Sequence, residues 1–277
     1  MKRIAVIGLG IIGGSISAAL KRANYAVDGA SRRKETVTCA KEFGYIDGEV
    51  VDLKDYDVVI LALPPRVTIE YLTEKEYKEG ALVADICGVK KALEDAVYEK
   101  KRNYRYIGLH PMAGKETSGL QSSTPDLFVG ANLVITHHEK TAASAVEEAK
   151  ELALALGFGK IVECSAEEHD KKIALTSQLA HIVSNAYVKS DEARDCDGFT
   201  GGSFQDMTRI AGVDERMWTE LYALNRDNIL AELNGLIEKL TVYKQALEEK
   251  DDKKLAEALK EGRLIRETSI RLPKRKK

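Results

Sequence analysis

Short apolar runs alternate with amphipathic stretches over residues 1–164 of the chain. The runs at residues 3–8 and 55–65 are rich in valine, isoleucine and leucine, which is typical of strands buried in a parallel sheet. The stretches between such runs carry apolar residues at helical spacing, and the last is expected to have Thr141 as its N-cap and to end at Gly157. This alternation predicts a parallel, doubly wound α/β sheet.

The pattern changes at Ser165, which forms a capping box with Glu168 and opens a long helix that is apolar on nearly all sides. From Asp214 onward, apolar residues recur at three- and four-residue spacing, and no further strand is expected. The sequence therefore predicts an α/β domain over residues 1–164 and an all-α C-terminal domain over residues 165–277. So much apolar helical surface must either fold over the sheet or pair with a second copy of the chain. A homodimer is favoured, with the helical half as its dimerisation domain.

Composition limits the kinds of partner. The chain has 277 residues, of which 44% are hydrophobic and 31% charged, and its net charge of −2 gives no overall basic field for nucleic acid. The four cysteines lack the spacing of a disulfide framework or of a metal site, so neither is expected. No apolar run approaches the roughly 20 residues of a membrane span, and the chain opens directly on a strand pattern. A cytoplasmic protein with no membrane or nucleic-acid partner is expected.

A glycine turn, GLGIIG, joins the first strand to the first helix and matches the G-x-G-x-x-G pattern of dinucleotide-binding proteins. Gly8 permits the tight turn, Gly10 lets a pyrophosphate approach the backbone, and Gly13 lets helix and strand pack closely. The N-terminus of the helix then presents free N–H groups to the phosphates, with Ile12 beside them. Residues 1–164 are therefore expected to form an N-terminal Rossmann domain.

The residues after the second expected strand indicate which dinucleotide is bound. A site for NAD places Asp or Glu there to bind the ribose hydroxyls, whereas this chain has Ser31, Arg32 and Arg33, and Asp28 falls too early. A hydroxyl and two guanidinium groups suit a 2′-phosphate, so NADP is expected to be preferred, with NAD possible. The alternative is that both arginines are solvated surface charges.

His110 ends a further apolar run and is followed by proline, methionine, alanine and glycine. Its strand should end at the carboxyl edge of the sheet, where the ligand cleft of such folds lies. Spacing alone leaves two interpretations open, a packed strand-end residue and a general base. By themselves, His169 and His181 of the long helix favour a structural role, and Arg209 beyond it has no special meaning.

Taken in order, the motifs of the chain resemble those of the prephenate/arogenate dehydrogenase family. The likeness runs from Lys2 to roughly Ile265 and rests on GLGIIGGS, LALPP, ADICGVK, GLHPMAGKETSG, SAEEHD, SQLAH and GGSFQDMTRIAGVDERMW. The His-Pro-Met-Ala-Gly run after a glycine turn is specific, and the Phe-x-Asp-x-Thr-Arg run supports it independently. The resemblance implies an enzyme that oxidises prephenate or arogenate with NAD(P), releases carbon dioxide and leaves an aromatic ring, on the route to tyrosine.

The resemblance also implies roles for particular residues. His110 matches the catalytic histidine, Arg209 an arginine that binds a substrate carboxylate, and His181 a histidine that lines the substrate site. Leu63 and Pro64, in the LALPP run, are expected beside the cofactor. The helical C-terminal half of the family forms its dimer, which agrees with the expectation from apolar surface.

Three more residues are assigned to the substrate site. Lys115 and Glu116 are expected to contact the side-chain end of the substrate, with an ordinary exposed ion pair as the alternative, and Gln178 stands where many relatives have a histidine. The family's serine near the catalytic histidine is Gly88 here. The imidazole must then be oriented by something else, and water or Cys87 are the candidates.

Two other functions stay open. A two-domain NADP dehydrogenase of the β-hydroxyacid or imine reductase type would use a catalytic Lys or Asp on the long helix, which carries Lys171, Lys172 and Lys189. A non-catalytic NADP-sensing protein would bind the cofactor without turnover. The presence of both His110 and Arg209 favours an enzyme.

Overall fold

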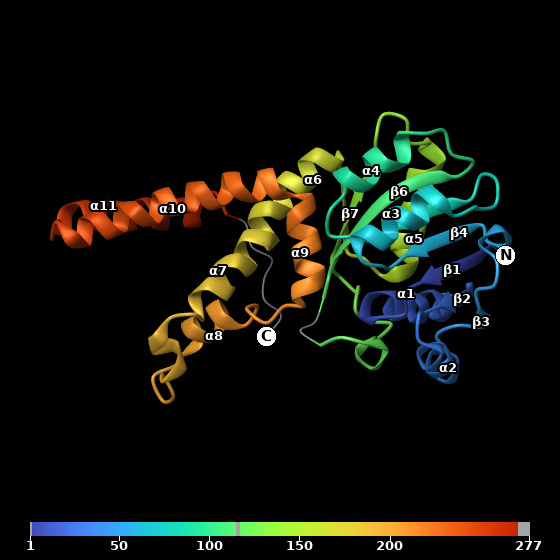
Figure 1. The fold of residues 1–277 in the computed structure, drawn as a ribbon, viewed down its shortest axis with the longest axis horizontal. Coiled ribbons are helices and arrows are strands. Elements are labelled where there is room, and N and C mark those ends of the chain that lie inside the picture. The colour runs from blue at the N-terminus through green and yellow to red at the C-terminus, as the bar shows by residue number, and fades with distance from the viewer. Residues whose placement is uncertain (1, 115–116, 271–277) are drawn as a thin grey trace. The chain divides into compact units, whose positions relative to one another are not determined.

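The computed structural model describes residues 2–114 and 117–270 of the chain, and Figure 1 shows its course from the blue N-terminus onward. The elements of the α/β part are, in order, β1 (Arg3–Ile7), α1 (Ile11–Arg22), β2 (Ala26–Ala30), α2 (Lys34–Glu42), β3 (Gly48–Glu49), β4 (Val58–Leu61), α3 (Pro65–Glu74), β5 (Leu82–Asp85), α4 (Lys91–Tyr98), β6 (Arg105–Met112), β7 (Asn132–Thr136), α5 (Ala143–Leu156) and β8 (Lys160–Cys164). The helices that follow are α6 (Ala166–Ile173), α7 (Ala180–Tyr187), α8 (Gly202–Thr208), α9 (Glu215–Leu224), α10 (Arg226–Glu248) and α11 (Asp252–Thr268).

One eight-stranded sheet runs in the order β3-β2-β1-β4-β5-β6-β7-β8. Neighbouring strands are parallel except β6 and β7, which pair antiparallel with His110 opposite Val134. The prediction of a wholly parallel sheet is wrong at this point. A parallel connection usually contains a crossover helix, whereas the described residues between β6 and β7 form only a short 3₁₀ turn at Leu120–Ser122.

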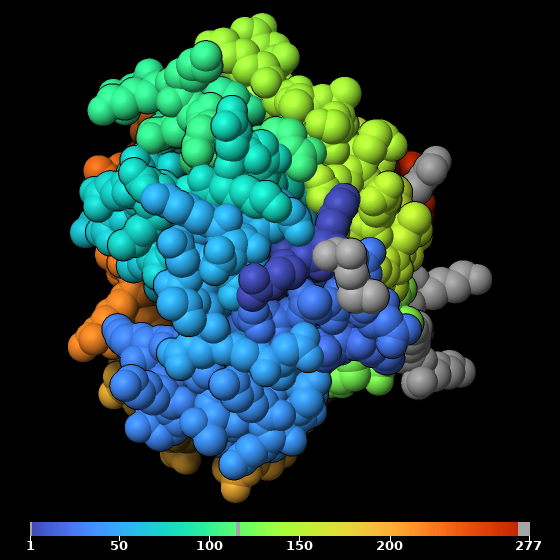
Figure 2. Space-filling view, turned by 90° about the vertical axis from the view of Figure 1, so that its right-hand side faces the viewer, coloured from blue at the N-terminus to red at the C-terminus, as the bar shows by residue number. Residues whose placement is uncertain are grey.

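Helices cover both faces of the sheet, which confirms the doubly wound architecture (Figure 1). On one face, α1 and α5 contribute Ile16, Leu20 and Leu152 to a buried core, and on the other, α3 and α4 contribute Leu72 and Leu93. Each such side chain stabilises the fold by roughly 1.5–3 kcal/mol. In the space-filling view of Figure 2, the blue segments of the first half pack directly against the cyan segments that follow.

Two predicted helix starts can be compared with the structure. The Ser165 hydroxyl accepts a hydrogen bond from the backbone N–H of Glu168 at 3.1 Å, which confirms the cap of α6. The predicted N-cap of α5, Thr141, is wrong by one residue. Its hydroxyl instead accepts from the backbone N–H of His138 at 2.9 Å and stabilises the turn ahead of the helix.

The predicted long helix is a continuous helical run made of α6, a π-helical turn at Ala174–Leu179, and α7. A π-helical turn inside an α-helix frequently marks a functional site. Within residues 2–114 and 117–270, no strand follows Cys164, as expected from the pattern.

The chain folds as two compact units, Met1–Arg226 and Asp227–Lys277. The first contains the sheet and α6 to α9. In the second, the Tyr243 hydroxyl of α10 donates to the carbonyl oxygen of Ala258 in α11 at 3.3 Å. The predicted domain boundary at residue 165 follows the change from strands to helices and stays a prediction. In the part of the chain that the structure describes, no helix has the length and apolar character needed to cross a membrane.

Candidate active site

The glycine turn between β1 and α1 is shaped for close approach of backbone groups. Gly8 has a φ of +100°, and a Cβ there would lie 2.2 Å from the carbonyl oxygen of Ala62. A Cβ on Gly13 would lie 1.9 Å from the carbonyl oxygen of Gly8, so only glycine lets α1 pack against the turn. A Cβ on Gly10 would meet nothing within 4 Å, and Ile12 lies half-buried in the first turn of α1. The turn fits a pyrophosphate at the N-terminus of α1.

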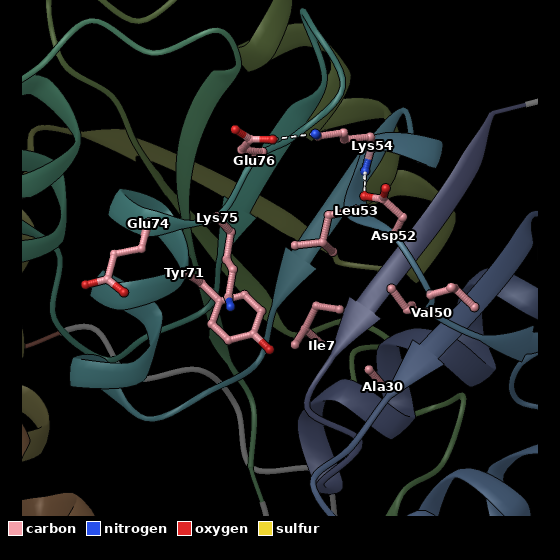
Figure 3. A pocket seen from close by; sticks show the side chains of 11 residues that line it. Ile7, Ala30, Val50, Asp52, Leu53, Lys54, Tyr71, Glu74, Lys75 and Glu76 are labelled. Carbon is pink, nitrogen blue, oxygen red and sulfur yellow. Dashed lines mark hydrogen bonds and ion pairs between the residues drawn. The ribbon is translucent and has the colours of Figure 1, made fainter.

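A pocket of about 430 Å³ adjoins this turn (Figure 3). Ile7 and Ala30, the last residues of β1 and β2, line it together with Tyr71 of α3. The Lys75 ammonium lies 5.5 Å from the centre of the Tyr71 ring. Aliphatic side chains facing an aromatic ring suit the adenosine end of a dinucleotide. The remaining lining residues are Val50, Val51, Asp52, Leu53, Lys54, Glu74 and Glu76.

The structure places the other predicted cofactor residues at the same edge of the sheet. Ser31, Arg32 and Arg33 follow β2, and Leu63 and Pro64 follow β4. Ser31 and Leu63 are half-buried, whereas both arginines and the proline are exposed. Because β2, β1 and β4 are neighbours, their carboxyl ends meet beside the glycine turn.

Asp28 is the one carboxylate of β2, and its hydrogen bonds are made to residues away from the carboxyl edge of the sheet. Its Oδ2 accepts from the guanidinium of Arg3 at 3.0 Å and from the hydroxyl of Tyr56 at 2.8 Å. Burial, with Asp28 adding to it, raises the pKa of Tyr56 above its usual value, which keeps the hydroxyl protonated as the donor. Asp28 is therefore held within a local network, two residues ahead of the strand end at Ala30.

His110 lies on β6 near the carboxyl edge of the sheet, as predicted. Strand alternation places it on the same face as Tyr106 and Gly108. Its Nδ1 lies 2.8 Å from Nε2 of His169, which is carried by α6. The residue as a whole is only half-buried.

The next residue in the chain, Asp170, holds the His169 ring in place. His169 is 2% exposed, and its Nδ1 lies 2.7 Å from Oδ1 of Asp170. Asp170 also accepts from the backbone N–H groups of Lys90 and Lys91, both at 2.9 Å, at the start of α4. A carboxylate at a helix N-terminus satisfies its free donors and complements its dipole. These bonds fix His169 beside His110.

A fully buried ion pair lies beneath the same residues. The Lys90 ammonium donates to Asp85 Oδ1 at 2.5 Å and to the carbonyl oxygen of Leu109 at 2.7 Å. Asp85 Oδ2 accepts from the Tyr106 hydroxyl at 2.7 Å. Because the ammonium is bonded on two sides, a fixed positive charge lies close to His110.

These surroundings favour a neutral His110. Burial lowers its pKa well below the ordinary 6.5, and His169 and the Lys90 ammonium lower it further. Although part of the residue is exposed, protein atoms surround the ring closely enough to limit its hydration. Burial also lowers the pKa of His169, with Asp170 opposing and Lys90 reinforcing this effect. Both imidazoles are neutral near pH 7, so His110 can accept a proton.

Gly88 lies beside the Nε2–Cε1 edge of the His110 ring. A Cβ on Gly88 would be 3.8 Å from both of these atoms. The hypothesis that Cys87 orients the imidazole is wrong. The Cys87 thiol donates instead to the hydroxyl of Thr68 at 3.3 Å. The hydrogen bond to the His110 ring is made at Nδ1, by Nε2 of His169 at 2.8 Å.

Two predicted substrate residues lie on the helical part of the first unit. His181 packs its ring against Trp218 with centroids 4.0 Å apart, and its Nδ1 donates to the carbonyl oxygen of Ser177 at 2.9 Å. Arg209 lies exposed at the end of α8. Their roles in binding substrate stay predictions.

The remaining predicted substrate residues are Gln178, Lys115 and Glu116. Gln178 is 2% exposed, and its Oε1 accepts from Asn225 at 2.6 Å. Asn225 also donates to the carbonyl oxygen of Asp170 at 2.8 Å, so Gln178 supports the residues behind His110. Lys115 and Glu116 lie outside the described residues.

The contacts of His169, Asp170 and Lys90 around His110 were not predicted from the sequence. One signal was available, because an acidic residue directly after a histidine in the first turn of an apolar helix suggests a buried pair. Nothing local indicated that this pair contacts His110, which is 59 positions away in the chain.

A turn that fits pyrophosphate and a neutral imidazole at the same edge of the sheet together define a dinucleotide-dependent dehydrogenase. The chain belongs to the prephenate dehydrogenase family. The family models for the nucleotide-binding domain and the dimerization domain of prephenate dehydrogenase match residues 16–162 and 165–261. The resemblance drawn from the motifs is thereby confirmed.

Individual relatives agree with this placement. The chain is 30% identical over 282 residues to the prephenate dehydrogenase of Lactococcus lactis subsp. cremoris, covering 96% of this chain and 77% of that protein. It is 30% identical over 267 residues to that of Bacillus subtilis, covering 91% and 72%. A crystal structure of prephenate dehydrogenase from Aquifex aeolicus with hydroxyphenyl propionate and NAD+ is 28% identical, with a TM-score of 0.84 over 96% of this chain and 97% of that one.

Proposed function

We propose that the protein catalyses the NAD(P)-dependent oxidative decarboxylation of prephenate to 4-hydroxyphenylpyruvate, or of arogenate to tyrosine, in tyrosine biosynthesis. The observation that carries the proposal is the neutral His110 imidazole, bonded to His169 at the carboxyl edge of β6 in a chain of this family. The ligand in the related Aquifex aeolicus structure, hydroxyphenyl propionate, carries the kind of ring that the reaction leaves.

His110 acts as the general base of the proposed reaction. The substrate carries a hydroxyl on the ring carbon opposite the carboxylate-bearing one, and His110 takes the hydroxyl proton as the C–O bond gains carbonyl character. A bound cofactor would supply the hydride acceptor for that carbon. Carbon dioxide leaves as the ring becomes aromatic, and the ring oxygen takes its proton back from His110. Base assistance of this kind contributes roughly 10²–10⁴ to the rate.

The helical residues position the substrate. Arg209 is proposed to hold a substrate carboxylate through paired, charge-assisted hydrogen bonds. His181, held by Ser177, is proposed to line the site. Lys115 and Glu116 are proposed to contact the side-chain end.

NADP is the proposed preferred cofactor, with NAD also accepted. Three observations support this: Ser31, Arg32 and Arg33 directly follow β2, both arginines are exposed to an incoming phosphate, and Asp28 is bonded to Arg3 and Tyr56. Guanidinium groups bind a 2′-phosphate with charge-assisted hydrogen bonds.

A homodimer is also proposed. The second matching family model describes a dimerization domain, and the second unit carries exposed apolar side chains that a partner could bury. They are Leu230, Ile237, Leu240, Val242, Leu247, Leu259, Leu264 and Ile265. The proposed location is the cytoplasm, where the four free cysteines would stay reduced.

Neither alternative function gains support from the site. Lys171, Lys172 and Lys189 are exposed, and Lys172 is paired with Glu168, which does not suit a catalytic lysine. The test is the absorbance of reduced nicotinamide, with prephenate and arogenate each combined with NAD+ and NADP+. Turnover of either substrate is expected. Cofactor binding without turnover of either would overturn the proposal and favour a sensor.

A further inference from the structure

Asp170 can only accept hydrogen bonds in this structure. Its Oδ1 accepts from the backbone N–H of Lys90 and its Oδ2 from that of Lys91. A carboxyl group that receives a backbone donor on each oxygen has no reason to carry a proton. The short contact between Asp170 Oδ1 and His169 Nδ1 therefore has its proton on His169.

The tautomers of both histidines follow from this. Neutral His169 with a proton on Nδ1 has a lone pair on Nε2. That atom lies 2.8 Å from His110 Nδ1, so the proton between the rings is on His110. Neutral His110 then has its own lone pair on Nε2, which lies beside Gly88.

We propose that His169 is a positioning residue that holds His110 as the Nδ1–H tautomer and thereby presents the Nε2 lone pair to the substrate hydroxyl. This inference rests on the proposed function in taking His110 as the base. Without His169, the Nδ1 atom would have no fixed acceptor, and the ring could turn or change tautomer.

The opposite arrangement would require a doubly protonated His169, which would donate from Nε2 to His110. The groups around the two rings disfavour it. Lys90 at the start of α4 already contributes a positive charge, and its partner Asp85 on β5 is bonded to that ammonium and to Tyr106 of β6. Asp170 and, less strongly, Asp85 favour a second cation, but burial is the largest effect and lowers the pKa of His169.

The same chain of bonds supports the base after it has reacted. When the substrate O–H bond breaks, an N–H bond forms at His110 Nε2, and the imidazolium keeps its Nδ1–H bond to His169. The His169 ring in turn keeps its bond to the Asp170 carboxylate, which is ionised. A fixed acceptor backed by a negative charge stabilises the new positive charge without reorganisation.

The tautomer can be measured without any turnover. In full-length protein labelled with ¹⁵N-histidine, the His110 signals are assigned from their loss in His110→Asn. We expect a protonated Nδ1 and an unprotonated Nε2 in the wild type, and a mixture of tautomers in His169→Leu. A wild-type His110 protonated on Nε2 would overturn the inference, as would an unchanged tautomer in His169→Leu.

Steady-state kinetics distinguish a positioning role of His169 from a role in packing alone. His169→Leu fills similar space without an acceptor and should lower kcat on the order of 10²-fold, since a wrong tautomer costs up to about 10⁴ in other enzymes. His169→Gln keeps a carbonyl acceptor and should stay within about tenfold of wild type. KM and cofactor affinity should change little in both. Equal losses in the two variants would mean that His169 serves only packing.

Control measurements distinguish a failure of the proposed function from a failure of the proposed role of His169. His137→Leu removes a half-exposed histidine on another part of the sheet domain and should leave kcat unchanged. If the wild type shows the expected tautomer but turns over neither substrate, the proposed function fails while the hydrogen-bond chain stands. If it turns over substrate with His110 protonated on Nε2, the function stands and the role of His169 fails.

Discussion

The Lys90 ammonium lies 2.5 Å from the Asp85 carboxylate, and neither side chain is exposed to solvent. The next residue, Lys91, also pairs with a carboxylate, that of Asp95, but both of these side chains are exposed. A fully buried ion pair is stable only with both partners present, because removing one leaves the other as a buried, unpaired charge. The two neighbouring lysines therefore offer a matched comparison.

Lys90→Met is expected to lower the free energy of unfolding by about 3–5 kcal/mol, because Asp85 loses its buried partner. Lys91→Met is the control and should cost less than about 1 kcal/mol, as exposed pairs do. Denaturant unfolding at a fixed protein concentration measures both. Similar losses in the two variants would contradict the burial argument.

His110→Ala should lower kcat by roughly 10²–10⁴ with little change in cofactor affinity, because only the base is removed. Since the pKa of His110 is lowered, wild-type kcat/KM should begin to fall only below pH 6.5. Steady-state rates against pH and cofactor titrations check both statements. A variant that keeps a third or more of the wild-type rate would refute the assignment.

Arg209→Ala should raise KM about 10- to 150-fold, the loss of roughly 1.5–3 kcal/mol from a charge-assisted contact. Arg216, exposed at the start of α9, is the control, and Arg216→Ala should leave KM unchanged. Initial rates over a range of substrate concentrations give the answer. An unchanged KM with lower thermal stability would make Arg209 structural.

Cofactor preference should reverse in the double variant Ser31→Asp, Arg32→Ala. The wild type is expected to favour NADP on the order of 10²-fold in kcat/KM, through contacts to the 2′-phosphate. A carboxylate at position 31 would repel that phosphate and accept bonds from a free ribose diol. The comparison is made at one ionic strength, because exposed charges are screened by salt. Equal use of both cofactors by the wild type would mean that the arginines point to solvent.

Acid should destabilise the fold through the two facing histidines. Because burial lowers the folded-state pKa of His110 and His169, the unfolded chain binds protons below pH 6.5 that the folded chain does not. The free energy of unfolding should then decrease as pH falls through and below 6.5, by up to about 1.4 kcal/mol per pH unit for each group. His110→Asn should show a shallower decrease in the same window. Parallel curves for variant and wild type would contradict the lowered pKa.

Features with a local cause could be predicted from the sequence. The glycines of the turn at Gly8, Gly10 and Gly13 lie within six positions, and the close approach of Gly13 to the carbonyl oxygen of Gly8 falls inside one strand–turn–helix unit. The cap at Ser165 depends on a backbone group three residues away. Periodicity likewise indicated the strands, because burial on both faces leaves continuous apolar runs.

Features that depend on contacts between distant segments could not be predicted. The bond from His110 to His169 joins a strand to a helix 59 positions later, and the pairing of Asp170 with α4 spans 80. The direction of β7 was missed for a similar reason, since apolar runs look the same in parallel and antiparallel strands. Family resemblance predicts a catalytic role for His110, but the residues that hold its ring come from distant parts of the chain and carry no local signal of that contact.

The bonds made by His169 and Asp170 also bear on how the protein can move. These two adjacent residues bind His110 on β6 and the first backbone N–H groups of α4. Swinging α6 away from the sheet would break all of these contacts together and expose a carboxylate and two unpaired amides. The start of the helical run is therefore a fixed anchor, not a hinge. Movements that admit substrate are expected to begin beyond it, at the π-helical turn of Ala174–Leu179 or later in the chain.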